Sequence, residues 1–429
     1  MDVSFFRVKI RGDVIRGETA SSLNRGIFQT TFLAWDMLEK SEHNTTATAP
    51  EKSPSKRVEA PRPPTVLQVL PALIAGGVER GTVDIVGAIV QGGGRAIVAS
   101  AGGPMTHEII RLGGEHVEMP VNSKNPLVMY SNISRLVELI LSENVDVIHA
   151  RSRAPAWSSW FAARRTTKHF VTTFHGAYEH GNILKHYYNS VMTKGEKVIA
   201  ISDFIAGHVR KVYGVPAAKL AMIPRGVDLA RFDPANISKE RVINQSQKWR
   251  LPDGVPVVML PGRLTRWKGQ TVFIKAIKQL RRKDFQCLIV GSDQGRSYYR
   301  QELVNQINGY GLSDVIHVID HCDDMPAAYM LTDVVVSAST EPEAFGRVVA
   351  EAQSLGRPVI ATDHGGARET VIDGETGWLT KPGDAKSLAA AIGVALDQSE
   401  AERSAFAARC VSYIRENFSK DQMCGRTLD

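Results

Sequence analysis

The sequence predicts an α/β protein with two Rossmann-like, doubly wound parallel sheets that face each other across a cleft. Three observations lead to this fold class. Short apolar runs alternate with amphipathic stretches from Thr65 onward, and a repeat of strand then helix with short links is typical of a parallel sheet. The polar segment 231–252 interrupts the alternation once, after which it starts again. A chain of 429 residues is also too long for one typical domain.

In the first half of the alternation, the strands are short apolar runs and the helices have apolar positions at helical spacing. We expect strands at 66–71, 95–100, 116–121, 146–150, 169–175, 197–202 and 220–228. We expect helices at 82–94, 105–112, 134–145, 157–166, 184–193 and 203–214.

The second half repeats the same order. We expect strands at 255–262, 284–291, 315–320, 334–339 and 358–362. We expect helices at 270–283, 298–311, 327–333, 345–356 and 387–396. The domains predicted from both halves are a flexible extension at 1–64, an acceptor domain at 65–235, a donor domain at 250–410 and a returning helix at 411–429. The extension includes segment 41–64, whose Pro, Ser, Thr and Lys residues cannot bury enough surface to offset ordering.

Composition narrows the class of protein. No apolar run approaches the roughly 18–20 residues that span a bilayer. The N-terminus has scattered charges and no apolar core of signal-peptide length, so we predict a cytoplasmic protein. The four cysteines form no CxxC pair, which makes a zinc site or a disulfide framework improbable.

The formal net charge is +7, and basic residues are dense between Arg151 and Lys219. This excess fits an anionic partner, such as a lipid headgroup or a phosphorylated substrate, although a solvated surface would look the same. No zinc finger or RNA-binding signature accompanies the charge, so we predict no nucleic-acid partner.

The motif with the most chemical content runs from Glu343 to Glu351, after a predicted strand and into a predicted helix. If the whole motif were helical, its two carboxylates would lie about 12 Å apart along the axis. That separation suits two groups that hold different hydroxyls of one long ligand, and the helix start at Phe345 and Gly346 offers backbone N–H groups to a phosphate. The alternative is a dipole-compensating glutamate followed by a solvated one.

A second motif, Arg263 to Lys268, follows the first strand of the second half. Two cations beside a helix start form a site for a diphosphate, unless they are only solvated turn residues. A third motif, Gly76-Gly77, follows the first strand of the chain, where paired glycines allow a ligand close to the backbone or simply make a tight turn. Neither is a Walker A loop or a GxGxxG fingerprint, which disfavours ATP hydrolysis and nicotinamide binding.

Single residues in other loops after strands complete the set. His175 lies directly before a glycine after a predicted strand, and Arg151 and Arg153 follow another, as candidates for acceptor contacts. Asp323 and Asp324 could suggest a metal site, but they precede a predicted helix and fit N-capping better. We predict no catalytic metal and no cofactor.

From about Thr65 to Thr380, these motifs in this order resemble glycosyltransferase family 4, a large group of retaining enzymes with the GT-B fold. The matching pieces are GGVER (76–80), HG (175–176), IPRGVD (223–228), GRLTRWKG (262–269), EAFGRVVAE (343–351) and GGARETVIDGETGWL (365–379). Arg225 departs from the family pattern, which commonly has asparagine before GVD.

The resemblance implies a role for each matching position. Arg263 and Lys268 would hold the donor diphosphate, Glu351 the ribose, and Glu343 the transferred sugar. The amides of Phe345 and Gly346 would lie near the sugar and phosphates, Gly76 and Gly77 would complete the phosphate site, and His175 would lie near the anomeric carbon.

The resemblance also implies the reaction. It is metal-independent transfer of a hexose, with retention, from a UDP- or GDP-linked donor to a glycan or glycolipid. The setting would be lipopolysaccharide or other cell-envelope synthesis, in the cytoplasm or at the inner face of the membrane. The alternatives are an epimerase or a phosphorylase on the same fold, or a sugar-nucleotide binding protein without activity.

Overall fold

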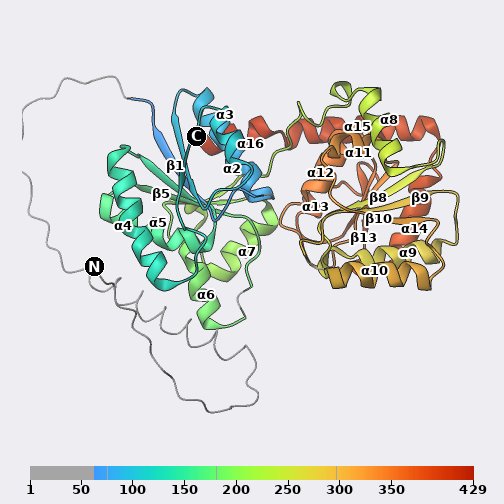
Figure 1. Cartoon of the computed structure of the whole chain (residues 1–429), viewed down its shortest axis with the longest axis horizontal. Coiled ribbons are helices and arrows are strands. Elements are labelled where there is room, and N and C mark those ends of the chain that lie inside the picture. Colours follow the sequence, from blue (N-terminus) through green and yellow to red (C-terminus); the bar gives the residue numbers. More distant parts are fainter. Residues whose placement is uncertain (1–61, 75, 180, 296) are drawn as a thin grey trace, which may run out of the picture. The chain divides into compact units, whose positions relative to one another are not determined.

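The computed structural model describes residues 62–74, 76–179, 181–295 and 297–429. Within them it contains two parallel β-sheets with helices on both faces of each, the architecture that the sequence predicts (Figure 1). The predicted flexible extension at 1–64 falls almost wholly outside the described residues. No helix in the described part of the chain has the length and apolar character needed to cross a membrane.

The first sheet has seven parallel strands in the order β3-β2-β1-β4-β5-β6-β7. Its strands are β1 (Thr65–Val69), β2 (Arg95–Ser100), β3 (Glu115–Glu118), β4 (Val147–Ala150), β5 (His169–Phe174), β6 (Lys197–Ala200) and β7 (Leu220–Met222). The helices along this part are α2 (Gly77–Gln91), α3 (Thr106–Arg111), α4 (Pro126–Ser142), α5 (Arg153–Thr166), α6 (Ile183–Ser190) and α7 (Asp203–Tyr213), with short 3-10 turns η2 (Val191–Thr193) and η3 (Ala217–Lys219).

Apolar side chains on both faces of this sheet are covered. Val83, Val86 and Ile89 of α2 pack with Val98 of β2 and Ile109 of α3 in one buried core. On the other face, α5 packs against β4 and β5 and against α4. The strand predicted over 220–228 ends at Met222, so the IPRGVD segment forms a loop after β7.

The second sheet has six parallel strands in the order β10-β9-β8-β11-β12-β13. They are β8 (Val257–Pro261), β9 (Gln286–Val290), β10 (Ile316–Ile319), β11 (Val334–Ser337), β12 (Val359–Thr362) and β13 (Gly377–Thr380). The helices are α9 (Gln270–Leu280), α10 (Ser297–Gly309), α11 (Met325–Met330), α12 (Arg347–Ser354), α13 (Ala367–Thr370) and α14 (Ala385–Leu396), with η5 (Arg266–Lys268) before α9.

In this sheet, α9, α10 and α14 cover one face, where Phe273, Leu303 and Ile392 are buried against the strands (Figure 1). The helices α11 and α12 lie on the other face, where Tyr329 is completely buried. Cys287 of β9 is also buried, as its apolar context predicts.

The polar segment between the sheets is more ordered than its composition suggests. It contains η4 (Pro234–Asn236) and α8 (Lys239–Trp249), which is capped by Ser238 and packs against α11. After the second sheet come α15 (Glu400–Asn417) and α16 (Lys420–Leu428). The last helix packs against α2, and its Met423 and Cys424 are buried in the core of the first sheet.

Candidate functional site

The predicted site residues follow the strands at the centre of each sheet. In the second sheet, Arg263 and Lys268 follow β8, and Glu343 follows β11, the strand hydrogen-bonded beside β8. The strand order changes direction between β8 and β11, because β9 and β10 extend the sheet on one side and β12 and β13 on the other. Such a switch point is where open α/β sheets bind ligands, beyond the carboxyl ends of the strands.

The structure brings Lys268 and Glu343 into direct contact, although 75 positions separate them in the sequence. Lys268 Nζ lies 2.8 Å from Glu343 Oε1, and the two side chains are only 13% and 14% exposed. Gly269 makes this approach possible, since a Cβ there would lie 1.8 Å from the Ala338 carbonyl oxygen and the residue has a φ of +74°. The turn after β8 therefore packs tightly against the end of β11.

Glu343 is held as a carboxylate. Ser337 and Ser339 donate their hydroxyls to the same oxygen that Lys268 contacts. Burial alone would raise the pKa of Glu343, but Lys268 and the two serines outweigh it, so the pKa lies below its usual value. An ionised carboxylate at neutral pH can accept hydrogen bonds from sugar hydroxyls but cannot donate a proton, which suits a positioning role.

Glu351 lies on α12, and its side chain is 12% exposed. Tyr329 donates to one of its oxygens at 3.2 Å and Arg347 to the other at 2.7 Å. The motif is not helical throughout, because α12 begins at Arg347 and Gly346 before it has a left-handed φ of +87°. Glu343 therefore lies in the loop before the helix, and the 12 Å spacing expected from a continuous helix does not apply.

Arg263 differs from Lys268 in its exposure and in its pairing. Its side chain is exposed, and its carbonyl oxygen accepts a hydrogen bond from Gln270 of α9 at 3.0 Å. Among the described residues its guanidinium has no ion pair within 4.0 Å. This places one accessible cation beside one paired cation after the same strand.

In the first sheet, the strand order changes direction between β1 and β4. Gly76 and Gly77 begin α2 after β1, and Arg151 follows β4, so three of the predicted residues flank this second switch point. His175 follows β5, the next strand along the sheet.

The contacts of His175 define its tautomer. Its Nδ1 lies 3.2 Å from Nη2 of Arg225, and arginine can only donate hydrogen bonds. Nδ1 must therefore accept, which leaves the ring proton on Nε2, a buried atom that has no hydrogen-bond partner in the described part of the chain. Burial, Arg225 and Arg151 hold the pKa of His175 well below its usual value, so the neutral ring presents one N–H.

The two arginines predicted to contact an acceptor have different surroundings. Arg151 is 4% exposed and donates to Gln68 of β1 at 2.9 Å. Arg153 begins α5, and its guanidinium lies over the ring of Tyr178, 4.3 Å from the centroid. The two side chains therefore lie in different surroundings, although only one residue separates them in the sequence.

The predicted capping role of Asp324 is confirmed. Its side chain accepts a hydrogen bond from the backbone of Ala327 at the start of α11 and pairs with Arg241 of α8 at 2.7 Å. Ser202 likewise caps α7, and its hydroxyl also donates to the carbonyl of Ala344 at 2.6 Å.

Comparison with known proteins now adds to this geometry. Residues 242–415 match the family model described as "Glycosyl transferases group 1", and residues 75–231 match "Glycosyltransferase Family 4". The chain is 38% identical in sequence to a glycosyltransferase of known structure from Rickettsia africae, with a TM-score of 0.80 over 85% of this chain and 97% of that one. The chain belongs to glycosyltransferase family 4.

Two curated relatives of this family 4 glycosyltransferase have named activities. A D-inositol 3-phosphate glycosyltransferase from Xylanimonas cellulosilytica is 28% identical over 66% of this chain and 71% of that protein. A GDP-mannose-dependent alpha-(1-6)-phosphatidylinositol monomannoside mannosyltransferase from Mycolicibacterium smegmatis is 29% identical over 61% of this chain and 69% of that protein.

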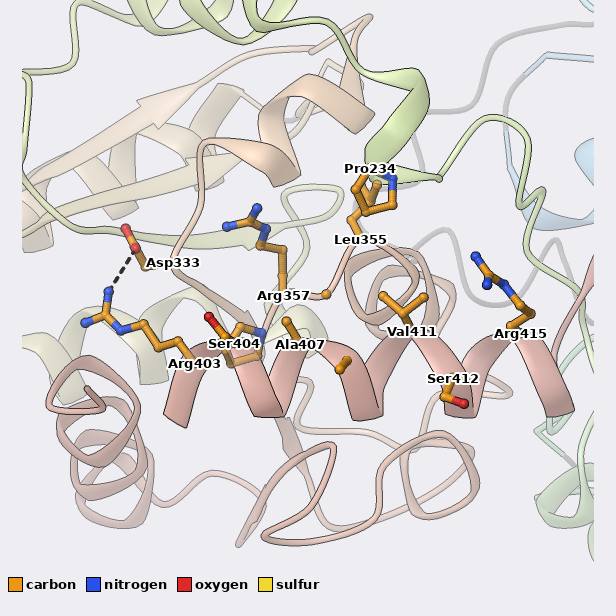
Figure 2. A pocket seen from close by; sticks show the side chains of 13 residues that line it. Pro234, Asp333, Leu355, Arg357, Arg403, Ser404, Ala407, Val411, Ser412 and Arg415 are labelled. Carbon is orange, nitrogen blue, oxygen red and sulfur yellow. Dashed lines mark hydrogen bonds and ion pairs between the residues drawn. The ribbon is translucent and has the colours of Figure 1, made fainter. Parts of the chain in front are cut away.

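A pocket of about 640 Å³ in the glycosyltransferase lies away from these residues (Figure 2). It is lined by Arg357 and by Arg403 of α15. Nη1 of Arg403 lies 3.4 Å from Oδ1 of Asp333. Asp333 and Pro358 immediately precede β11 and β12, so the pocket opens at the amino ends of the strands. The donor-site candidates all follow carboxyl ends, and the pocket is not part of their site.

Sequence reasoning missed two residues with prominent contacts. Arg225 was noted only as a departure from the family pattern, yet it is 6% exposed and contacts both Gly77 and His175. Glu369 accepts hydrogen bonds from the backbone N–H groups of Asp203 and Phe204 at 2.7 and 2.8 Å. Only the glutamate's place in the GGARE segment could have drawn notice to it, because no local pattern predicts a bond across 166 residues.

Proposed function

We propose that this protein transfers a hexose, with retention of anomeric configuration, from a UDP- or GDP-linked sugar to a glycan or glycolipid of the cell envelope. The observation that carries the proposal is the buried Lys268–Glu343 pair at the switch point between β8 and β11. The mycobacterial relative supports the donor and acceptor classes, since its name specifies GDP-mannose and a phosphatidylinositol mannoside. No observation favours an epimerase, a phosphorylase or a binding protein without activity.

The donor diphosphate would bind between Arg263 and Lys268. The exposed guanidinium of Arg263 can approach two phosphate oxygens at once, whereas the Lys268 ammonium acts as a point charge. The backbone N–H groups of Phe345 and Gly346, just before the eight-residue helix α12, would add hydrogen bonds. Gly76 and Gly77 would let the first turn of α2 approach the same phosphates.

The remaining donor contacts are hydroxyl contacts. Glu351 would accept hydrogen bonds from the ribose, with Arg347 and Tyr329 fixing the orientation of its carboxylate. Glu343 would accept them from the transferred sugar, and His175 would lie near the anomeric carbon of that sugar.

The chemical step requires stabilisation of the charge that grows on the departing β-phosphate. Arg263, Lys268 and the α12 amides would interact with this charge more strongly in the transition state than in the ground state, which lowers the barrier. The acceptor hydroxyl would attack from the leaving-group side and pass its proton to the departing phosphate oxygen. Glu343 stays ionised and holds the sugar, without acting as a nucleophile, and no divalent metal is needed.

The acceptor would bind on the side of the first sheet, with Arg151 and Arg153 as contacts. Exposed basic residues such as Arg164, Arg210 and Lys211 would hold the protein at the inner face of an anionic membrane. Salt-sensitive binding to liposomes that contain anionic lipid is expected, and equal binding to neutral liposomes would contradict the membrane part of the proposal.

The decisive experiment identifies the donor first. A thermal-shift panel of UDP-, GDP- and ADP-sugars should show one donor that stabilises the protein, and slow hydrolysis of that donor without acceptor should follow. NMR of the released sugar or product would give the anomeric configuration. An isomerised donor would indicate an epimerase, whereas binding without any turnover would indicate a binding protein.

A further inference from the structure

Two arginines are buried side by side in the first sheet without an acidic partner. Arg151 follows β4 and Arg225 follows β7, and they are 4% and 6% exposed. Among the described residues, neither guanidinium has a carboxylate within 4.0 Å. Buried charges are normally paired, because an unpaired one loses most of its hydration without compensation.

The first turns of α2 provide the space for both guanidiniums. A Cβ on Gly81 would lie 1.8 Å from Arg225 Nη1 and 3.1 Å from Arg151 Nη2. Both side chains therefore meet the helix at Gly81, a position that has no side chain. Burial and the neighbouring Arg151 lower the pKa of Arg225 to about 9, and the more distant Asp84 and Glu79 compensate only in part.

Several hydrogen-bond donors around this point have no acceptor among the described residues. Arg225 uses only Nη2 in its two contacts, with the Gly77 carbonyl and with His175. Within residues 62–429 as far as the structure describes them, Nε of Arg151 is buried without a partner, and so is Nε2 of His175, which carries the ring proton. A cluster of donors from three side chains fits a ligand with several acceptor oxygens and negative charge, as a phosphate has.

We propose that Arg151, Arg225 and His175 form a phosphate subsite of their own, separate from the pair Arg263 and Lys268 that follows β8. The phosphate belongs either to the acceptor or to the donor diphosphate, and both sources present the same chemistry to the arginines. This inference rests on the proposed function and deepens it, since it places a required anionic group at the side of the first sheet.

The test uses two variants that act on the subsite in different ways. Arg225→Met removes the charge and keeps most of the volume. Gly81→Ala keeps the charge but fills the space that Nη1 occupies, which forces the guanidinium to move. The matched control is Gly87→Ala on the same helix, where a Cβ would meet only Leu112 at an ordinary 3.6 Å.

Calorimetric titration of the full chain with inorganic phosphate should show binding that both subsite variants weaken by about tenfold or more, whereas the control leaves it unchanged. Phosphate that still binds at saturating UDP or GDP assigns the subsite to the acceptor. Phosphate that competes with the nucleotide, together with tenfold weaker nucleotide binding in Arg225→Met, assigns it to the donor.

The inference is overturned if Arg225→Met and Gly81→Ala bind phosphate and nucleotides within twofold of the control. It is also overturned if Arg225→Met lowers the melting temperature of the unliganded protein with phosphate affinity unchanged, because the arginine then has only a structural role. Failure of the donor assignment would look different. In that case Lys268→Ala would bind UDP or GDP as tightly as the wild-type protein does, regardless of how the subsite variants bind inorganic phosphate.

Discussion

Lys268→Ala tests the proposed site most directly, because it removes the cation that faces both Glu343 and the expected diphosphate. The side chains of the pair are 13% and 14% exposed, so solvent screens the contact little. Loss of one partner of a buried ion pair costs about 3 kcal/mol or more, equivalent to roughly 6–12 °C in melting temperature for a domain of this size. Loss of one stabilising charge at the departing phosphate costs about 10²–10³ in kcat.

The pH dependence of stability separates the structural effect from the catalytic one. In the wild-type protein the pKa of Glu343 is lowered on folding. The contribution of this carboxylate to the free energy of unfolding is therefore fully present above the unfolded pKa of about 4.3, and it is lost as pH falls through the lower folded pKa. Without Lys268, burial should raise the pKa of Glu343. The variant should then become more stable, relative to wild type, as pH falls from 7 to 5.

The test compares three proteins: wild type, Lys268→Ala and a double variant. For each, the free energy of unfolding is measured by denaturation at several pH values, and turnover of the donor is measured as well. The double variant Lys268→Met with Glu343→Gln removes both charges and should recover most of the stability without recovering activity. A Lys268→Ala protein with wild-type melting temperature and turnover would refute the assignment of this pair.

Three further changes have definite expected outcomes. Glu351→Gln should weaken UDP or GDP binding by about tenfold in calorimetry with little change in kcat, and unchanged affinity would contradict the ribose contact. The rate between pH 6 and 8 should show no titration of His175, because its pKa lies well below 6.5; a limb near 6.5 that disappears in His175→Gln would contradict this. Gly365→Ala should reduce kcat more than Gly374→Ala, since both have positive φ but only at Gly365 would a Cβ meet the Glu343 backbone oxygen, at 2.4 Å; equal effects would contradict that packing.

Much of the fold could be predicted because the local signals agree with the final structure. Apolar strands and amphipathic helices alternate, and the polar interruption separates the two sheets. Neither β13 nor α8 was predicted from the sequence, and two of the errors in element bounds fall where backbone conformation decides. The strand predicted over 220–228 stops at Met222, and the helix predicted from 345 begins only after the left-handed Gly346.

The site was less predictable, because its key contacts join distant parts of the chain. The sequence marks Lys268 and Glu343 as candidates, but only the pairing of β8 with β11 makes them neighbours. Arg225 shows the limit more clearly. A single arginine in a loop after a strand looks solvated, and its burial depends on the missing side chain of Gly81 on another element.

The distribution of charge links the proposed donor site to the proposed phosphate subsite. Lys268 is already neutralised by Glu343 in the unliganded protein, and Arg347 by Glu351, so Arg263 is the one cation after β8 left uncompensated among the described motif residues. A nucleotide-sugar diphosphate carries more negative charge than one arginine can balance, and it gains another as the sugar leaves. Arg225 and Arg151 would supply further positive charge for the proposed reaction, beside the His175 ring expected at the anomeric carbon. If the subsite binds the acceptor phosphate instead, the same charge selects an anionic acceptor. Either way, the two arginines are a cost to stability that Asp84 and Glu79 offset only in part and that a bound anion would reduce further.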